Sequence, residues 1–263
     1  MELLNHIQIE EFINIGYIKI EDAFPTKIAE ECLNILWKDS GCDPDDPATW
    51  TKPVIRLGYY SQEQFQKAVN TSLLHSAFND LVGEERWLPR NNLGSFPIRF
   101  PNNDEPGDTG WHVDGSLPGD DLNNFSTYRI NVNSRGRALL MLFIFSDVGE
   151  HDAPTRIREG SHLDVARILA PEGEKGLSFM QLATKLDTTA FRPEALATGK
   201  AGTVYLCHPF LVHAAQPHHG KNPRFMAQPP LHPSTEFKLY RSDGNYSPVE
   251  IAIRKGIGLD NNV

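Results

Sequence analysis

The segment 138–145, with the sequence ALLMLFIF, is almost wholly apolar. It is far too short for a membrane-spanning helix, which needs about 20 residues. A short, continuous apolar run is typical of a β-strand buried on both faces, although periodicity alone also permits a buried helix here. Such a strand needs a layer of structure on each side of its sheet. The chain is therefore expected to fold around a sheet that is covered on both faces.

The sequence divides into two parts of different texture near residue 90. Before it, helical patterns dominate: helices are expected at 8–15, 26–39, 62–69 and 72–82, with a brief strand at 17–20. After it, short apolar runs are separated by Gly and Pro: strands are expected at 95–100, 128–133, 138–145, 203–207 and 224–231, with one helix at about 163–170. This order indicates a helical layer followed by a β-core.

The fold class predicted from these patterns is mainly β with N-terminal helices. A helical layer over about 1–90 would pack on an antiparallel β-core over about 91–240. No internal repeat or low-complexity linker interrupts the sequence, so one domain spanning 1–263 is expected. An antiparallel core of this size suits a double-sheet jelly roll, which can hold a ligand in its mouth.

Charge and cysteine content narrow the partners. The chain has 25 Lys and Arg against 34 Asp and Glu, a formal net charge of −9. This balance argues against nucleic acid and against an anionic membrane surface as partners, and leaves a small molecule. The three cysteines form no paired framework, and the N-terminus lacks the apolar run of a signal peptide, so a reducing, cytoplasmic location is expected.

The segment 110–115, GWHVDG, carries the first sign of chemistry. Residues i and i+2 of an extended chain point to the same side, so His112 and Asp114 can converge on one ion while Val113 turns away. One imidazole and one carboxylate, with a second histidine, suit iron(II) and leave three positions for other ligands. The spacing alone is weak evidence, because His-x-Asp also occurs in ordinary exposed turns.

A second pattern lies in the segment 202–213, which begins with a glycine-led apolar strand, turns at Pro209 and ends in His213. Eleven residues later, Arg224 begins another apolar stretch. A dicarboxylate co-substrate needs an anchor for its far carboxylate, and arginine supplies a charged, bidentate fork for that task. His112, Asp114, His213 and Arg224 together are far more specific than any one of them.

With these residues, the sequence resembles the phytanoyl-CoA dioxygenase-like family of 2-oxoglutarate oxygenases. The resemblance covers roughly 96–231, through the WHVD segment at 111–114, the REGSH segment at 158–162, the strand leading to His213, and Arg224. It implies a double-stranded β-helix, a cupin-like form of jelly roll. It also implies that His112, Asp114 and His213 hold Fe(II), and that Arg224 binds the far carboxylate of 2-oxoglutarate.

The sequence departs from the family pattern at two places. A hydroxyl residue often follows the distal histidine by two positions and helps to hold the same carboxylate, but here that position is Ala215. An aromatic residue often lines the co-substrate on the strand before the Gly-Ser-His segment, where we expect Leu142 and Phe143 instead. His162, at the end of that segment, is interpreted as part of a structural turn rather than as a third ligand.

Several further side chains have two readings. Arg99 either meets the co-substrate or an anionic substrate, or is a solvated charge at a strand end. Trp111 either packs beside the metal strand or walls the substrate channel. Arg129 and Arg137 belong to a basic cluster with Arg135, which is either a solvated hairpin or a cradle for a carboxylate or phosphate of the substrate. The Gly- and Asp-rich segment 107–121 is a candidate lid.

The function predicted is that of an Fe(II)- and 2-oxoglutarate-dependent dioxygenase that uses O2 to oxidise, most simply to hydroxylate, a C–H bond of a small molecule. An intact carboxylate at Asp114 favours hydroxylation or related oxidation over halogenation, which needs that position free. Three alternatives stay open: a catalytically silent metal-binding jelly roll, a cupin-type oxygenase that does not use 2-oxoglutarate, and a zinc hydrolase. The sequence specifies neither the substrate nor the oligomeric state.

Overall fold

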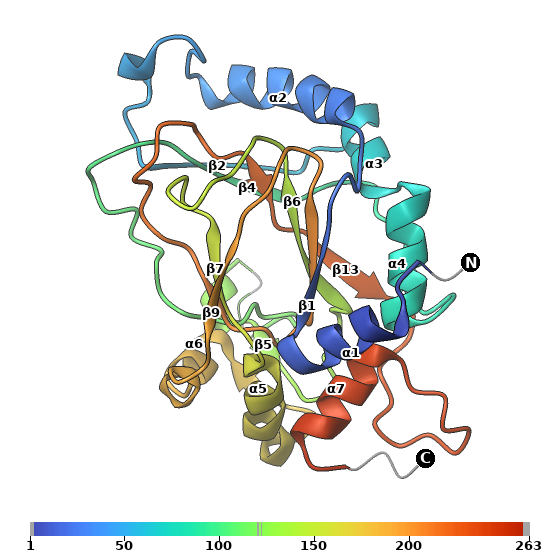
Figure 1. Ribbon diagram of the computed structural model, residues 1–263. Coiled ribbons are helices and arrows are strands. Elements are labelled where there is room, and N and C mark those ends of the chain that lie inside the picture. The colour runs from blue at the N-terminus through green and yellow to red at the C-terminus, as the bar shows by residue number, and fades with distance from the viewer. Residues whose placement is uncertain (1–2, 120, 122, 260–263) are drawn as a thin grey trace.

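The structure is a computed structural model, and it describes residues 3–119, 121 and 123–259. Four of the seven α-helices described lie before residue 83, and the part that follows is richer in strands but contains three more helices (Figure 1). The helices are α1 (His6–Ile15), α2 (Thr26–Ser40), α3 (Glu63–Val69), α4 (Ser72–Val82), α5 (Ser161–Leu169), α6 (Phe179–Ala183) and α7 (Pro248–Gly256).

The strands form antiparallel sheets of different sizes. They are β1 (Tyr17–Ile20), β2 (Val54–Gly58), β3 (Trp87–Leu88), β4 (Ser95–Arg99), β5 (Arg129–Ile130), β6 (Leu139–Ile144), β7 (Thr155–Arg158), β8 (Leu177–Ser178), β9 (Glu194–Ala197), β10 (Val204–Cys207), β11 (His213–Ala214), β12 (Met226–Ala227) and β13 (Pro230–Pro233). The main sheet has the order β1-β10-β6-β13-β3, with β12 also paired to β6. A three-stranded sheet has the order β11-β7-β9, and β2 pairs with β4.

Strand β6 lies at the centre of the main sheet and is buried at all six positions. Its alternate side chains enter two different apolar cores. Met141 and Phe143 pack with the helices, in a core that also holds residues of α2 and α4. Leu142 faces the other way, into a core shared with Ile157 of β7 and Ala197 of β9. The prediction of a strand buried on both faces is therefore confirmed, because helices cover one face and the second sheet covers the other (Figure 1).

The N-terminal helices begin and end close to where the sequence predicts. Asn5 caps α1 with a reciprocal capping box, and Thr71 caps α4 by accepting from the Leu74 N–H. Gly41 ends α2 in the left-handed region, at φ 72°. A residue with a Cβ is strained in that conformation, so a glycine there is an effective stop.

The expected fold class was too strongly β. Helices contribute more of the described residues than strands do, so the fold is mixed helix and sheet. The additional helix α7 follows a capping box between Ser247 and Glu250 with a proline at its first position. It packs against α1, α4 and α5, closing the helical layer with the C-terminal end of the chain.

Two predicted strands are shorter than expected, and the segment around His162 is different. The 224–231 stretch divides into β12 and β13, because the consecutive prolines at 229 and 230 supply no ladder N–H. Only Arg129 and Ile130 of the 128–133 stretch pair as a strand. The residues after Gly160 do not form a turn between strands: Ser161 opens α5, and the strand directly before this segment is β7 rather than β6.

Two general findings bear on the environment of the chain. None of the described helices is both long enough and apolar enough to span a bilayer. Cys32, Cys42 and Cys207 are all free thiols.

Truncation of side chains on β6 tests the double-sided burial. Leu142→Ala and Phe143→Ala should each lower the free energy of unfolding by about 2–5 kcal/mol, because each leaves a cavity in a different core. The matched control is Leu88→Ala on β3, where the leucine is half exposed and its loss should cost less than about 1 kcal/mol. Urea denaturation would measure all three variants. Tolerance of either core substitution would contradict the two-sided packing.

Candidate metal centre

Two histidines far apart in the sequence face each other across a pair of main-chain hydrogen bonds. The N–H of His112 donates to the carbonyl of His213, and the N–H of His213 donates to the carbonyl of His112. The nitrogen–oxygen distance is 3.0 Å in each hydrogen bond. In an antiparallel pair, residues directly opposite each other project their side chains on the same side. The two imidazole centroids are accordingly 4.4 Å apart. The main chain thus fixes both rings on one face.

Asp114 completes a group of three donor side chains. Its Oδ1 lies 3.8 Å from Nε2 of His112 and 4.0 Å from Nε2 of His213. One donor atom from each residue lies within 4.8 Å of the other two, which is close enough to hold one metal ion. An ion about 2.1 Å from each donor fits between them after a small inward shift. The structure therefore brings together the three residues that the sequence predicts as ligands.

Both histidines are oriented for metal binding by the same local contact. Nδ1 of His112 is 2.8 Å from the carbonyl of Gly110, and Nδ1 of His213 is 3.0 Å from the carbonyl of Leu211. A carbonyl only accepts, so each Nδ1 carries the proton and each Nε2 keeps its lone pair for an ion. An ordinary exposed turn does not require this contact between Nδ1 and a carbonyl. Because the contact recurs on both rings, it favours a metal site over an exposed turn.

The protonation states also suit an ion. Burial and the neighbouring His112 lower the pKa of His213 to about 4, against an opposing effect of Asp114. The imidazole of His213 is therefore neutral at pH 7, the form that binds metals. Burial acts to raise the pKa of the Asp114 carboxyl, but Arg137 and the two histidines together hold it below its ordinary value. Asp114 is thus a carboxylate near neutral pH.

The basic cluster predicted near residue 130 does not act as one unit. Arg137 is buried and donates from Nη1 to Asp114 Oδ2 over 3.2 Å, so it supports the outer oxygen of the candidate ligand. Arg129 instead donates to the carbonyls of Lys175 and Gly176. Arg135 pairs with Glu236 at the surface. Among the three, Arg137 alone touches the metal centre.

Trp111 is held between two arginines of β7. The guanidinium carbons of Arg156 and Arg158 lie 4.6 Å and 4.1 Å from its ring centroid. Arg156 also donates to the carbonyls of Thr109 and Ala215, which flank the two histidine-bearing segments. Arg156 was not predicted as a site residue, although alternate arginines on one strand face are a signal for a shared contact.

A cavity of about 550 Å³ opens beside the two histidines. Trp111 and Ala215 line it, and so does Arg99, whose side chain is only 2% exposed. Arg99 donates from Nη2 to both oxygens of Asp108, but its Nε and Nη1 have no hydrogen-bond partner among the described residues. Buried donors without an acceptor are costly, so this arrangement favours an anionic ligand in the cavity.

Arg224 lies behind this cavity rather than in its lining. It is 1% exposed. Its Nη1 donates to the carbonyl of Ala153 at a distance of 2.6 Å, and its Nη2 donates to the carbonyl of Pro97 at 3.1 Å. Its Nε has no partner among the described residues. Arg224 and Arg99 are opposed across an antiparallel bridge between their backbones. Burial, and then the charge of Arg99, lower the pKa of Arg224 well below its ordinary value, and Asp108 offsets this only in part.

The candidate lid borders the cavity beside the histidines. Asp108 pairs with Arg99 and with Arg56, tying the start of the 107–121 segment to β4 and β2. Gly107 and Gly110 line the cavity beside the histidines. Asp120, within the same predicted segment, lies outside the described residues.

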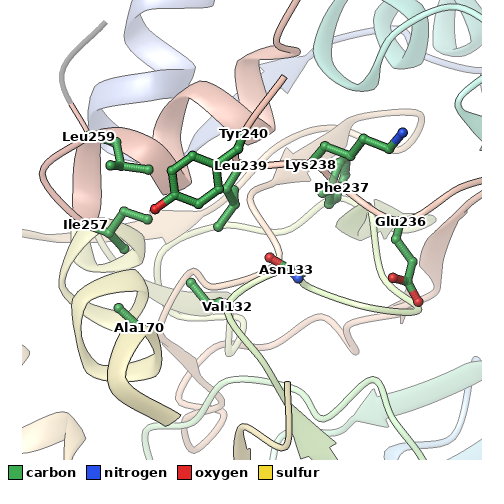
Figure 2. A pocket seen from close by; sticks show the side chains of 10 residues that line it. All are labelled: Val132, Asn133, Ala170, Glu236, Phe237, Lys238, Leu239, Tyr240, Ile257 and Leu259. Carbon is green, nitrogen blue, oxygen red and sulfur yellow. The ribbon is translucent and has the colours of Figure 1, made fainter. Parts of the chain in front are cut away.

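Other histidines and another cavity are separate from this group. His162 and His208 stack in the interior, and each has Nε2 against a main-chain carbonyl, of Ile13 and of Val249. A cavity of about 590 Å³ lies beside residues 236–240, and Tyr240 and Ile257 are among its lining residues (Figure 2). None of the residues predicted for the site lines that cavity.

Comparison with known proteins shows similarity in structure alone. No protein-family model and no curated protein matches the sequence. The structure of HygX from Streptomyces hygroscopicus with nickel and 2-oxoglutarate bound aligns with a TM-score of 0.57 at 20% identity, covering 89% of this chain and 90% of that one. SnoK, a non-heme α-ketoglutarate-dependent carbocyclase from nogalamycin biosynthesis, aligns with a TM-score of 0.56 at 17% identity, covering 94% and 87%.

A third solved structure agrees with these two. Apo EctD from S. alaskensis aligns with a TM-score of 0.54 at 19% identity, covering 88% of this chain and 77% of that one. At this level of identity the chain shares the fold of these proteins.

Removal of one histidine tests the metal centre directly. His213→Ala should weaken Fe(II) binding by more than about 100-fold, because loss of a ligand costs more than loss of an outer contact. The matched control is His151→Ala, an exposed histidine outside the group, which should leave binding unchanged. Anaerobic titration with Fe(II) would measure both. Equal affinity in the two variants would rule out His213 as a ligand.

Arg156 offers a test of the support around the ligands. Arg156→Met keeps an apolar stem against Trp111 but removes the donors to both histidine-bearing segments, so Fe(II) affinity should fall by about 10-fold. Arg167→Met is the control, since Arg167 is largely exposed and pairs with Asp164 on its own helix. The same titration applies, with melting temperature followed in parallel. Unchanged affinity in Arg156→Met would show that β7 does not position the ligands.

Proposed function

We propose that this chain is an Fe(II)- and 2-oxoglutarate-dependent dioxygenase that hydroxylates a C–H bond of a small molecule. The observation that carries the proposal is the pairing of His112 with His213 beside Asp114, next to a cavity that holds unsatisfied guanidinium donors. Two imidazoles and one carboxylate on one face are the donor set of non-haem Fe(II) oxygenases. The net reaction is R–H + 2-oxoglutarate + O2 → R–OH + succinate + CO2.

His112, Asp114 and His213 would hold the iron. When bound, the iron supplies the oxygen chemistry, and three protein ligands leave positions for a co-substrate and O2. The protein contributes by fixing the ligands: the main-chain bridge sets the two rings, and Arg137 holds the outer oxygen of Asp114. A rigid, preorganised centre of this kind needs little rearrangement on binding.

Arg99 and Arg224 would together receive the 2-oxoglutarate dicarboxylate. Arg99 faces the cavity with two unpartnered N–H groups and would make the direct contact. Arg224 has its Nη atoms committed to main-chain carbonyls, so it would act from behind, through its charge and its free Nε. This division also accounts for Ala215, because Arg99 supplies donors in place of the missing hydroxyl group.

The fold and the neighbours support the proposal at a coarser level. Two antiparallel sheets facing each other across an apolar core are consistent with one jelly-roll domain of the double-stranded β-helix type. HygX has been solved with 2-oxoglutarate and hygromycin B, and SnoN with iron, α-ketoglutarate and nogalamycin RO. By extension from these two proteins, we propose that the substrate of this chain is also a small molecule. The free thiols of all three cysteines suit the reducing interior of a cell.

The co-substrate assignment is tested by turnover of 2-oxoglutarate. The chain with Fe(II) should release succinate only when O2 is present. Arg99→Gln should raise the 2-oxoglutarate concentration needed for half-maximal release by at least about 10-fold, the effect of losing a charged hydrogen bond. The control is Arg135→Gln, which removes an equal charge from a surface ion pair.

The outcomes separate the rival functions. Oxygen-dependent turnover without 2-oxoglutarate would indicate a cupin-type oxygenase. Hydrolysis without oxygen would indicate a zinc enzyme. Binding of Fe(II) without any succinate release would indicate a silent module. Equal 2-oxoglutarate dependence in the two variants would contradict the role of Arg99.

A further inference from the structure

A second cavity, of about 770 Å³, adjoins the metal centre on the side of Asp114. Gly115 and Arg137 line it, and Arg137 donates to Asp114 Oδ2. Gln228 lines both this cavity and the one beside the histidines. The two cavities therefore share Gln228 in their walls. One lies beside His112 and His213 and the other beside Arg137, which offers separate places for the co-substrate and for another molecule.

The lining of this second cavity is cationic, although the protein is acidic. Arg90 and Arg137 contribute the charges of its wall, and none of the described lining residues is Asp or Glu. The chain as a whole has a net charge of −9. A positively charged cavity in a negatively charged protein concentrates anionic ligands.

The charge of Arg90 is not neutralised by the protein. Its Nε and Nη1 donate to the carbonyls of Asn92 and Pro230, and its Nη2 donates to the amide oxygen of Asn92. These acceptors are neutral, and no carboxylate of the described residues lies within ion-pair distance of Arg90. Burial, and then the charge of Arg137, lower the pKa of Arg90, so the two guanidinium groups repel each other.

Arg137 adds an unsatisfied donor to the same wall. Its Nη1 and Nη2 contact Asp114 and the carbonyl of Gly115, but its Nε is buried and has no partner among the described residues. Among the described residues its one carboxylate partner is Asp114, which an iron ion would also engage. An anion between Arg90 and Arg137 would relieve both the repulsion and the unmet donor.

Aromatic side chains border the cavity where it opens to solvent. Tyr59 is 87% exposed and Phe125 is 47% exposed, and both line the cavity. Tyr59 also has a φ of 65°, in the region that disfavours residues with a Cβ. Exposed aromatic rings and local strain both concentrate at binding sites. Such rings offer flat apolar surfaces to a ligand.

We propose that this cavity binds the primary substrate, and that the substrate is a small organic molecule carrying an oxyanion group, carboxylate or phosphate, beside a flat apolar portion. The proposal rests on the dioxygenase function proposed above. Arg90 would bind the oxyanion, the aromatic rim would contact the flat portion, and Arg137 would position the anion relative to Asp114. The C–H bond to be oxidised would then approach the three candidate ligands from the side of Arg137.

Matched acid and amide probes test this assignment. The holoprotein would first be saturated with Fe(II) and 2-oxoglutarate in the absence of oxygen, so that Arg99 is occupied. It would then be titrated calorimetrically with two acid and amide pairs, benzoate with benzamide and phenylacetate with phenylacetamide, and with phenyl phosphate. At least one oxyanion probe should bind at least about 10-fold more tightly than its neutral counterpart, phenol serving for phenyl phosphate. Which oxyanion binds best assigns the group as carboxylate or phosphate.

Three variants locate the effect. Arg90→Gln should abolish the preference for the oxyanion, and Arg90→Lys should keep most of it, since the charge remains while part of the hydrogen bonding is lost. Arg135→Gln removes a nearby charge that is outside this cavity and should keep the preference in full. Melting temperatures would confirm that the variants are folded.

Two results would overturn the proposal. In one, no oxyanion probe binds about 10-fold more tightly than its neutral counterpart. In the other, the preference for the oxyanion survives in Arg90→Gln. Binding of 2-oxoglutarate is measured in the same samples. If 2-oxoglutarate fails to bind while Arg90 still selects oxyanions, the proposed function fails and the anion site stands. If 2-oxoglutarate binds and the preference for oxyanions is missing, the proposed function stands and the anion site fails.

Discussion

The pair of main-chain hydrogen bonds between His112 and His213 is the constraint on which the rest of the site depends. These bonds join segments about a hundred residues apart and place two imidazoles on one face. The i+2 spacing then adds Asp114 to the same face. β7 supports the arrangement from one side, because β11 pairs with it and because Arg156 contacts the carbonyls that flank both histidine-bearing segments.

Charge is distributed unevenly around this bridge. An acidic chain gathers guanidinium groups near the three ligands: Arg99 lines the cavity beside the histidines with Arg224 behind it, and Arg137 contacts Asp114 and shares a second cavity with Arg90. Several of their N–H groups have no partner among the described residues. Burying such donors is costly unless an anion completes them. The two groups therefore indicate two anion-binding regions, which we propose serve the co-substrate and the substrate.

Local signals predicted much of this structure, and long-range pairing accounts for what they missed. The helix that ends at Gly41 and the two-faced burial of β6 follow from capping and hydrophobic pattern. The convergence of His112 and Asp114 follows from their i+2 spacing in an extended segment. The relative places of Arg99 and Arg224 do not follow from local signals, because they depend on how β4 lies against the 224 segment. The fold class was overestimated as β because predicted strands such as 128–133 pair over only two residues, and because α7 was not predicted.

The account is tested most directly by locating the metal. Crystals grown without oxygen in the presence of Fe(II) would be measured at the iron absorption edge. The account predicts one anomalous peak about 2.1 Å from Nε2 of His112, Nε2 of His213 and an oxygen of Asp114. A peak bound elsewhere, or an ordered structure in which His213 lies outside bonding distance of the ion, would contradict it.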